Sequence, residues 1–386
     1  MGLFRMIIVR QAIAAFLACM VFGAPVPAQN GRAYEFVLID ALPDDKGSTA
    51  KGINAFAEAV GYTYSDAEAY RAFLWEIEKS CAACDYNSIM IDLGTLGASY
   101  TRAYGINDLK QVVGYSYNAQ GFSRAFLWEE GVMTDLGALG SGLWSAAFSI
   151  NNAGQVVGYA YTSDQWNAYH AFLWQEAKTC VQCGNEGVMI DLGTLGGDHS
   201  VAFVINDPGQ VVGRSEILSG SSRYHAFLWE RVRTCVQCGT EERMTDLGTL
   251  GGDHSDAWGL NDLGQVVGWS EVIPGDPAFH AFLWEDGVMT DLGTLGGELS
   301  EARAVNNPGQ VVGYSRTQTD DPRACLWEGD KIIDLNDLLP SGVGWELIFA
   351  NDINDEGCIV GTAFNGEESQ AFLLIPGPAL QKAPTF

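Results

Sequence analysis

The sequence predicts an all-β protein, a seven-bladed β-propeller built from four-stranded antiparallel blades. Three observations lead to this fold class. A unit that contains the phrase Ala-Phe-Leu-Trp, with small variations, occurs seven times. Each copy reads as four short strands, and no stretch shows a sustained helical period. The third strand of the unit is apolar on both faces, so its sheet must lie between similar sheets.

The repeat is defined by three landmarks. Upstream of the Ala-Phe-Leu-Trp phrase stands Ile-Asn-Asp-x-Gly-Gln-Val-Val-Gly, as in residues 205–213, and downstream stands Asp-Leu-Gly-Thr-Leu-Gly-Gly, as in residues 191–197. Successive copies of the downstream Asp are 52, 43, 56, 55, 45 and 43 residues apart. The longer spacings carry insertions, so the basic period is 43 to 45 residues, which is typical of a propeller blade. The phrase begins at Ala72, Ala125, Ala171, Ala226, Ala281, Ala324 and Ala371.

Within one unit the strands follow in order. Residues 200–205 form the first, and Asn-Asp-x-Gly then makes a turn, because Asn and Asp bond their own backbone and Gly tolerates positive φ. Residues 210–215 form the second strand and residues 225–230 the third. In the fifth unit Asp286-Gly287 is a tight hairpin signal between the third and fourth strands.

That hairpin fixes the register of the outer two strands. Trp284 is expected to face Met289, and Phe282 to face Asp291. The sixth unit gives the same register, with Trp327 facing Ile332 and Cys325 facing Asp334. Because strand side chains alternate, Phe282 and Trp284 share one face while Ala281 and Leu283 share the other. Both faces therefore require a neighbouring sheet.

The two ends of the repeat region complement each other. Residues 34–40 read as a fourth strand without its first three, and the last unit, ending at residues 371–375, lacks a fourth. We therefore expect the N-terminal strand to complete the last blade and close the ring, which removes exposed edges. The alternative is an open β-solenoid, although solenoid repeats are usually shorter and need capping ends. The expected organisation is a signal peptide at 1–28, a single domain at 34–376 and a tail at 377–386.

The first 28 residues indicate secretion. Arg5 and Arg10 precede an apolar run over residues 12–23, and Val26-Pro27-Ala28 offers a small-residue cleavage site. No later segment reaches the ~20 apolar residues needed to cross a membrane. The formal net charge of −27 becomes −29 when the two leader arginines are removed. We expect a secreted protein, extracellular or periplasmic, that binds neither nucleic acid nor an anionic membrane.

Six cysteines form three Cys-x-x-Cys pairs in insertions between the third and fourth strands. The interpretation that suits an oxidising compartment is a structural disulfide within each pair. The alternative is zinc bound by the thiolates of the second and third pairs. The pairs are Cys81 and Cys84, Cys180 and Cys183, and Cys235 and Cys238. Cys325 and Cys358 stand apart, either buried and inert or joined between the last two blades.

Histidines and acids repeat with the blades, which favours structural roles. His170, His225 and His280 stand just before the Ala-Phe-Leu-Trp phrase, diagonal to the Asp of their unit, and we expect polar contacts such as His280 with Asp291. Arg124 takes the same place beside Asp135. His199 and His254 lie in loops between blades, where a metal is conceivable, but the Asp before each reads better as a turn cap. We assign no catalytic residue, no metal and no cofactor.

One position varies strongly from unit to unit. It follows the Ala of the first strand, and its neighbours are small, as suits the crowded innermost strand. Side chains at this position are expected to line the channel or its mouth, on the same side as the variable loops between the second and third strands. The alternative is drift at unconstrained positions. The candidate binding residues are Lys51, Tyr104, Phe148, Phe203, Trp258, Arg303 and Asn351.

The repeated phrases resemble a known family. His225-Ala226-Phe227-Leu228-Trp229, together with residues 205–213 and 246–252, is similar to the bacterial extracellular His-Ala-Phe (HAF) repeat family, and the similarity covers residues 34–375. The resemblance implies secretion and a repeat architecture, and it brings no catalytic residues. We predict a monomeric, non-enzymatic module that binds a glycan or an extracellular protein through its variable face. The alternative function is a propeller-fold hydrolase that acts on carbohydrate.

Overall fold

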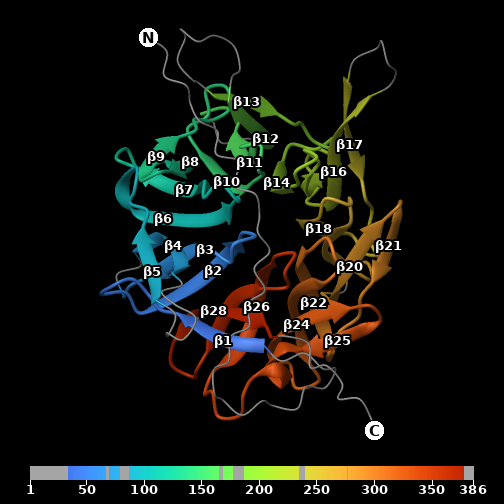
Figure 1. Ribbon diagram of the computed structural model, residues 1–386. Coiled ribbons are helices and arrows are strands. Elements are labelled where there is room, and N and C mark those ends of the chain that lie inside the picture. Colours follow the sequence, from blue (N-terminus) through green and yellow to red (C-terminus); the bar gives the residue numbers. More distant parts are fainter. Residues whose placement is uncertain are drawn as a thin grey trace.

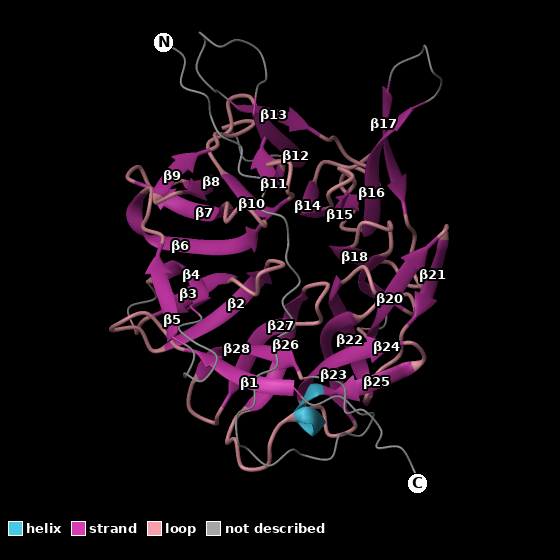
Figure 2. Ribbon diagram, in the orientation of Figure 1, coloured by secondary structure: helices cyan, strands magenta, loops and turns pink. Residues whose placement is uncertain are grey.

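The computed structural model describes residues 34–66, 69–78, 87–164, 168–176, 187–233, 240–275 and 277–377. In these ranges the chain is almost entirely β-strand, with a single 3-10 helix, η1, at Leu335–Leu338 (Figure 2). The sheets are arranged around a common axis, and the chain passes from one to the next in sequence order (Figure 1). No helix within the described ranges is long and apolar enough to span a membrane.

The strands group into seven repeat units, which we number in chain order. Unit 1 contains β2 (Gly47–Ile53), β3 (Ala59–Tyr64), β4 (Tyr70–Glu78) and β5 (Asn87–Asp92). Unit 2 contains β6 (Gly97–Ile106), β7 (Val112–Asn118), β8 (Ser123–Glu129) and β9 (Val132–Asp135). Unit 3 contains β10 (Ser145–Ile150), β11 (Val156–Tyr161), β12 (Tyr169–Glu176) and β13 (Gly187–Asp191). Unit 4 contains β14 (Ser200–Ile205), β15 (Val211–Glu216), β16 (Tyr224–Arg233) and β17 (Thr240–Asp246).

The last three units follow the same order. Unit 5 contains β18 (Ser255–Leu260), β19 (Val266–Glu271), β20 (Phe279–Glu285) and β21 (Val288–Asp291). Unit 6 contains β22 (Gly296–Val305), β23 (Val311–Thr317), β24 (Pro322–Glu328) and β25 (Lys331–Asp334). Unit 7 contains β26 (Glu346–Ile353), β27 (Ile359–Phe364) and β28 (Ser369–Pro376), and its fourth strand is β1 (Tyr34–Ile39), which pairs with β28 antiparallel.

The predicted register of the outer hairpins is confirmed. Trp284 pairs with Met289 and Phe282 with Asp291. In unit 6, Trp327 pairs with Ile332 and Cys325 with Asp334. A two-residue turn leaves no freedom to slip, which explains why this register could be predicted from the sequence.

The prediction of a closed seven-bladed β-propeller is wrong. Within the described residues the strands form five open sheets, three with four strands and two with eight, and none of these sheets closes on itself. The larger sheets arise where a long first strand reaches the third strand of the preceding unit. In one, Tyr100 of β6 pairs with Tyr70 of β4, and in the other Leu299 of β22 pairs with Phe279 of β20, both in parallel orientation. The first strands β6 and β22 have 10 residues each and include the bridging residue. An equivalent parallel bridge joins Tyr169 to His199, just before the shorter strand β14, without merging the two sheets.

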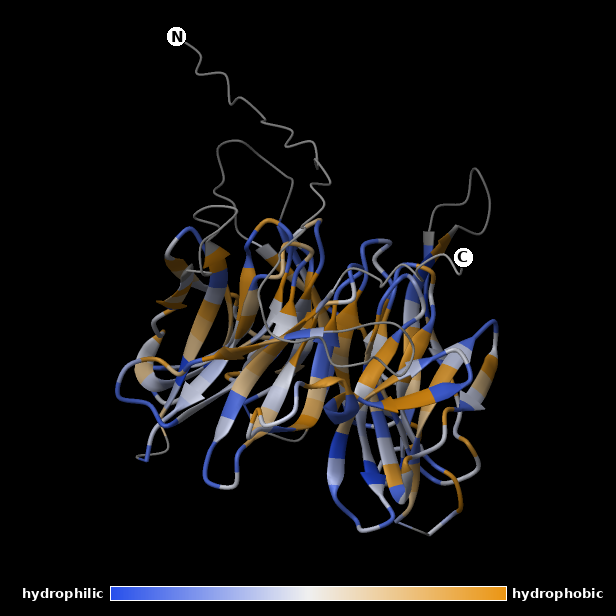
Figure 3. Cartoon of the chain, turned by 60° about the horizontal axis from the view of Figure 1, so that its bottom comes forward, coloured by the Kyte–Doolittle hydropathy of each residue, from blue (hydrophilic) through white to orange (hydrophobic). Residues whose placement is uncertain are grey.

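The core lies between neighbouring units, as the apolar character of both strand faces predicted. Ala171 and Leu173 of β12 share a buried cluster with Phe227 and Trp229 of β16, in the next unit. The Phe of the repeated phrase is fully buried in six of the units. Figure 3 shows hydrophobic residues recurring along the strands of the sheets. Each unit therefore buries one face against its predecessor and the other against its successor.

Candidate ligand-binding cavity

A β-bulge interrupts the first strand of every unit. Its pairing with the second strand skips one residue, as between Ala202 and Val204 in unit 4, where Phe203 is left unpaired. The same shift occurs in the other units. A bulge leaves one residue out of the ladder and re-aims its side chain. The bulge residues are Lys51, Tyr104, Phe148, Phe203, Trp258, Arg303 and Asn351, which are the seven candidate binding residues.

The glycine that ends Gln-Val-Val-Gly makes room for the bulge. A Cβ added at Gly213 would overlap the carbonyl oxygen of Val201 on the neighbouring strand. Gly61, Gly114 and the corresponding glycines of the other units meet a carbonyl oxygen in the same way. A glycine inside a strand often marks such a close backbone approach. The repeated glycine therefore allows each unit to carry a bulge residue.

The seven bulge residues surround one cavity of about 540 Å³ on the axis of the molecule. The structure thus brings together all seven residues that the sequence singled out, while their role in binding stays a prediction. Four successive bulge residues are aromatic and touch one another. Tyr104 meets Phe148 edge-on at 5.2 Å between ring centroids, Phe148 lies 5.7 Å from Phe203, and Phe203 stacks on Trp258 at 4.1 Å. They form an aromatic wall over about half of the cavity.

Trp258 adds an unsatisfied donor to this wall. Its indole Nε1 is buried and has no hydrogen-bond partner among the residues that the structure describes. A buried donor without a partner costs about 1–3 kcal/mol. The aromatic wall is therefore not fully satisfied by the protein alone.

The other half of the cavity is polar. Arg303 donates from Nε to Glu301 at 2.7 Å and from Nη1 to the Asn351 side chain at 2.5 Å. Asn351 in turn donates to the carbonyl oxygen of Ala50 at 2.7 Å. The guanidinium of Arg303 also lies over the Phe349 ring, 4.7 Å from its centroid. Arg303 is thus held in place by three neighbours, and its charge is matched by Glu301.

Asp352 follows Asn351 and also lines the cavity. Its carboxylate accepts hydrogen bonds from the backbone N–H groups of Ile53 and Ile353, both at 2.9 Å. Burial raises its pKa to about 7, against these two hydrogen bonds, which lower it. Asp352 therefore changes charge close to neutral pH.

Lys51 completes the polar side. Burial, followed by the repulsion of Arg303 and Arg102, lowers the pKa of its amine to about 7, while Glu301 acts in the opposite direction. Its amine makes no hydrogen bond or ion pair with any residue in the described ranges, although the side chain lines the cavity. Among the described residues, the Lys51 amine therefore has no counter-ion in contact with it.

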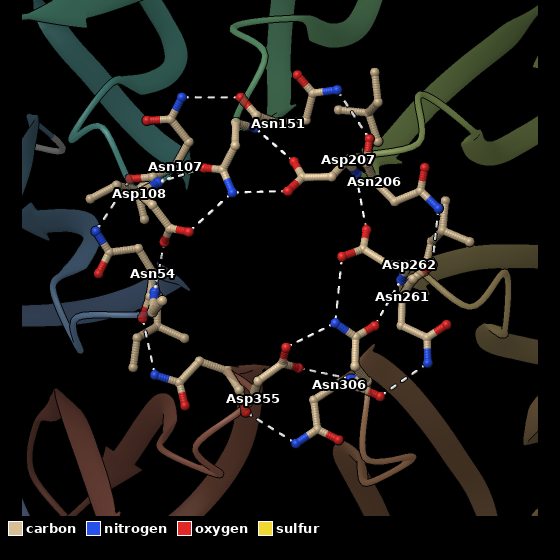
Figure 4. A pocket seen from close by; sticks show the side chains of 18 of the residues that line it. Asn54, Asn107, Asp108, Asn151, Asn206, Asp207, Asn261, Asp262, Asn306 and Asp355 are labelled. Atoms are coloured by element: carbon tan, nitrogen blue, oxygen red, sulfur yellow. Dashed lines mark hydrogen bonds between the residues drawn. The ribbon is translucent and has the colours of Figure 1, made fainter. Parts of the chain in front are cut away.

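Beyond the cavity a ring of asparagines surrounds the axis at the opposite mouth (Figure 4). Each ring asparagine donates from Nδ2 to the backbone carbonyl of the next one, at 3.0 to 3.2 Å, and the last, Asn354, donates to Asn54. The same amide bonds its own turn, as Asn206 does with Gln210 through both the side chain and the backbone N–H. We call Asn54, Asn107, Asn151, Asn206, Asn261, Asn306 and Asn354 the asparagine ring.

The residues that follow the ring asparagines form a second circle of bonds. The backbone N–H of Asn152 donates to Asp207, and the N–H of Asp207 donates to Asp262. The amide of Asn152 also reaches the carboxylates of Asp108 and Asp207 at 3.0 Å. The acidic side chains at this mouth therefore act as acceptors for neighbouring units.

The histidines before the repeated phrase make the predicted structural contacts. His280 lies 2.8 Å from the Asp291 carboxylate, and Arg124 donates to Asp135 at 3.1 Å. His170 and His225 do the same with Asp191 and Asp246. Although burial acts to raise it, the hydrogen bonds from His170 and Gly193 hold the pKa of Asp191 below its usual value. Unit 6 departs from the pattern, because Arg323 pairs with Glu346 while Asp334 caps η1.

The remaining candidates are placed as follows. His199 stacks on Tyr169, and His254 accepts a hydrogen bond from the backbone N–H of Tyr224. Cys325 and Cys358 are buried and unpaired, and burial raises the pKa of both thiols, to about 11 for Cys358. The three Cys-x-x-Cys pairs lie outside the described residues, so their disulfides stay a prediction.

Sequence reasoning missed two charged residues of the cavity, Glu301 and Asp352. The residue before Asp352 is the bulge position, and the other units place Gly52, Gly105, Ser149, Val204, Gly259 and Ala304 where unit 7 has Asp352. A charged residue at a position otherwise small or apolar was the available signal. The bulge was also missed, although a glycine in the middle of each second strand pointed to it.

Comparison with known proteins supports the fold and is silent on the ligand. A family described as "Protein of unknown function (DUF3466)" matches residues 194–374. No curated protein matches the sequence. The β-propeller domain of the Trilobed protease from Pyrococcus furiosus, described as having an open velcro topology, is similar at a TM-score of 0.54 and 9% identity, covering 87% of this chain and 99% of that one.

Two further structures are more distant. TolB from Acinetobacter baumannii gives a TM-score of 0.43 with 11% identity, covering 88% of this chain and 66% of that one. A triple arginine-to-alanine mutant of AofleA from Arthrobotrys oligospora gives 0.40 with 11% identity, covering 78% and 90%. The likeness to the β-propeller domain of the Trilobed protease and the observed strand order together show an all-β protein similar in fold to a β-propeller, composed of four-stranded units in open sheets.

Proposed function

We propose that this protein is a secreted binding module and that it takes a glycan into the cavity surrounded by the seven bulge residues. The observation that carries the proposal is the convergence of all seven variable positions on one cavity. A position that only drifts has no reason to gather four aromatic side chains on one side and its charged residues on the other. The leader-like first 28 residues support the secreted part of this proposal.

The size and lining of the cavity support a small ligand or the end of a chain. Ligand sites commonly enclose about 300–1,000 Å³ and combine apolar walls with a few fixed polar groups. The cavity of about 540 Å³ has this composition. Its aromatic wall offers π-faces with negative potential, on which the weakly positive C–H face of a sugar ring packs well. The polar side offers donors and acceptors for hydroxyl groups.

The test is a glycan array probed with the wild-type protein and with two variants. Trp258→Ala removes part of the aromatic wall, and Phe56→Ala changes an exposed side chain at the opposite mouth, so it serves as the matched control. We expect Trp258→Ala to weaken the strongest array signal at least about tenfold, since such an anchor contributes more than about 1.4 kcal/mol. Phe56→Ala is expected to bind like the wild type.

Two results would overturn the proposal. One is an array on which the folded wild-type protein binds no glycan. The other is a glycan that binds equally well to the wild type and to a folded Trp258→Ala variant, because that glycan would lie elsewhere on the surface. Binding to an extracellular protein instead of a glycan would retain the module and replace the ligand.

A further inference from the structure

The charged groups of the cavity are not evenly matched. Arg303 is paired with Glu301, and Asp352 accepts from two backbone N–H groups. Lys51 has no hydrogen-bond or ion-pair partner in the part of the chain that is described, and its side chain lines the cavity. A buried or enclosed charge is normally paired, because it loses the solvation that water provides. Within the described lining, Lys51 is therefore a cationic group that no carboxylate contacts.

We propose that the ligand of this cavity carries a carboxylate on a ring, and that the Lys51 amine binds this carboxylate while the ring packs on the aromatic wall. The inference rests on the proposed function and deepens it, since it names the chemical class of the ligand. An acidic sugar residue and an aromatic acid share this chemistry. A cationic ligand fits less well, because the carboxylates of the cavity already have partners.

The surroundings of Lys51 favour an anion. Arg102 on β6 and both Glu301 and Arg303 on β22 act on its charge, and Tyr104 on β6 and Asp352 on β26 line the same cavity. The nearby cations raise the local potential, which is one reason why the pKa of the amine falls to about 7. A carboxylate placed there offsets that repulsion and stabilises the protonated amine. Binding of the anion is therefore coupled to proton uptake by Lys51.

The direction of the pH dependence follows from this coupling. Below about pH 7 the amine of the free protein is already protonated, so its contribution to the affinity for the anion is complete. Protonation of Asp352 in the same range removes a negative charge from the cavity and favours the anion further. Above that pH the proton must be taken up on binding, and affinity falls as the pH rises. Near neutral pH a fraction of a proton should be taken up by the amine for each ligand bound, and this fraction should rise with pH.

The experiment is isothermal titration calorimetry of the full chain with two matched pairs of probes. Glucuronate and glucose differ by one carboxylate on a sugar ring, and phenylacetate and 2-phenylethanol differ in the same way on an aromatic ring. We expect the acid of at least one pair to bind at least tenfold more tightly than its neutral partner. Titrations in two buffers of different ionisation enthalpy measure the proton uptake, and the pair that responds identifies the source of the ligand.

Two variants separate the charge from its titration. Lys51→Met should abolish the preference for the acid, whereas Lys51→Arg should keep it and lose the share of the proton uptake and of the pH dependence that comes from the amine, because arginine stays charged. The share that comes from Asp352, whose pKa is raised to about 7, should remain in both variants. Circular dichroism of both variants shows that they fold. If Lys51→Met does not fold, the Lys51→Arg titration alone decides the question through its pH profile.

Several outcomes would overturn the inference. Equal affinity for acid and neutral partner, a preference that survives in Lys51→Met, or no binding of any of the four probes would each do so. Equal affinity for acid and neutral partner, combined with loss of binding in Trp258→Ala, would reject the carboxylate as the recognised group and would retain the proposed glycan-binding function. A preference for phenylacetate alone would support the inference and contradict the proposed glycan.

Discussion

The two ends of the central axis differ in how strictly the repeat fixes the residues that surround it. At one mouth the asparagine ring places the same residue at all seven positions, and each amide is bonded within its own turn and to the next unit. A few residues earlier on the same strands, the bulge position holds seven side chains of six residue types around the cavity. The first layer is saturated by the protein itself, whereas the second leaves Lys51 and the Trp258 indole without partners among the described residues.

The difference shows which parts of the repeat serve the fold and which are available for another purpose. The asparagine and the strand glycine satisfy needs that recur in every unit, so they recur too. The bulge residue is released from the ladder, and its side chain has no structural duty that all units share. Substitutions in the two layers should therefore have different consequences for stability.

The largest effect is expected from Gly213→Ala. A Cβ at this position would overlap the backbone carbonyl of Val201, and backbone cannot move aside as a side chain can. We expect a loss of more than about 3 kcal/mol of unfolding free energy, or failure to fold. Urea denaturation measures it. Gly220→Ala is the control, because nothing lies near its Cβ and only the positive φ of 72° opposes the change, at a cost of about 1 kcal/mol. Equal losses for the two would contradict the bulge explanation.

Asn206→Ala should come next. It removes the bonds to Gln210 and to the carbonyl of Asn261, and leaves their partners unsatisfied in a buried position. We expect the free energy of unfolding to fall by about 2–3 kcal/mol, which a lower melting temperature would show. Leu263→Ala, an exposed change at the same mouth, should stay within about 0.5 kcal/mol. A ring that tolerated Asn206→Ala equally well would not be structural.

Lys51→Met should stabilise the protein at low pH. The amine has its usual pKa of 10.5 when unfolded and about 7 when folded, so the folded state carries a penalty that is complete below pH 7. This penalty is relieved as the pH rises from 7 to 10.5. We expect the free energy of unfolding of the variant to exceed that of the wild type by about 2 kcal/mol at pH 6 and by little at pH 10. The gain at pH 6 lies within the limit set by linkage, which is ~1.4 kcal/mol for each unit of pKa shift. A gain that did not change between these pH values would have another cause.

The smallest effect is expected from Asp291→Ala, at the outer edge of unit 5. This change removes the contact with His280 and the bond from the Gly293 N–H, both partly exposed. The free energy of unfolding should fall by about 1 kcal/mol, which should lower the melting temperature slightly. Thr290→Ala, its exposed neighbour on the same strand, is the control. An Asp291 variant as stable as that control would remove the structural explanation for the repeated pair.

Local features of the fold could be predicted where one short segment determines them. The turn at Asp286-Gly287 fixed the register of its hairpin, and apolar residues on both faces of the third strand predicted units packed on each other. The bridges that merge units into eight-stranded sheets depend on a single pair, such as Tyr70 with Tyr100, and no pattern within one unit announces it. That is why the closed propeller was a wrong prediction.

The cavity was predictable in position and only partly in composition. Small neighbours indicated that Phe203 and its counterparts lie near the axis. The partners that decide the chemistry come from other units, such as the Ile53 N–H that bonds Asp352. A bond between residues so distant in the chain depends on how the units are placed, which a repeat alone does not specify. The asparagine ring escaped notice for the same reason, since its Asn was read only as a turn residue.

The pairing of β1 with β28 affects the order of events during synthesis. The strand that a ribosome produces first finds its hydrogen-bonding partner only when the last strand has been made. Until then Tyr34–Ile39 has an unpaired apolar edge that invites association with another nascent chain. In a polypeptide truncated before residue 369, β1 has no pairing partner at any stage. Cellular proteases and chaperones should therefore recognise such fragments as unfolded.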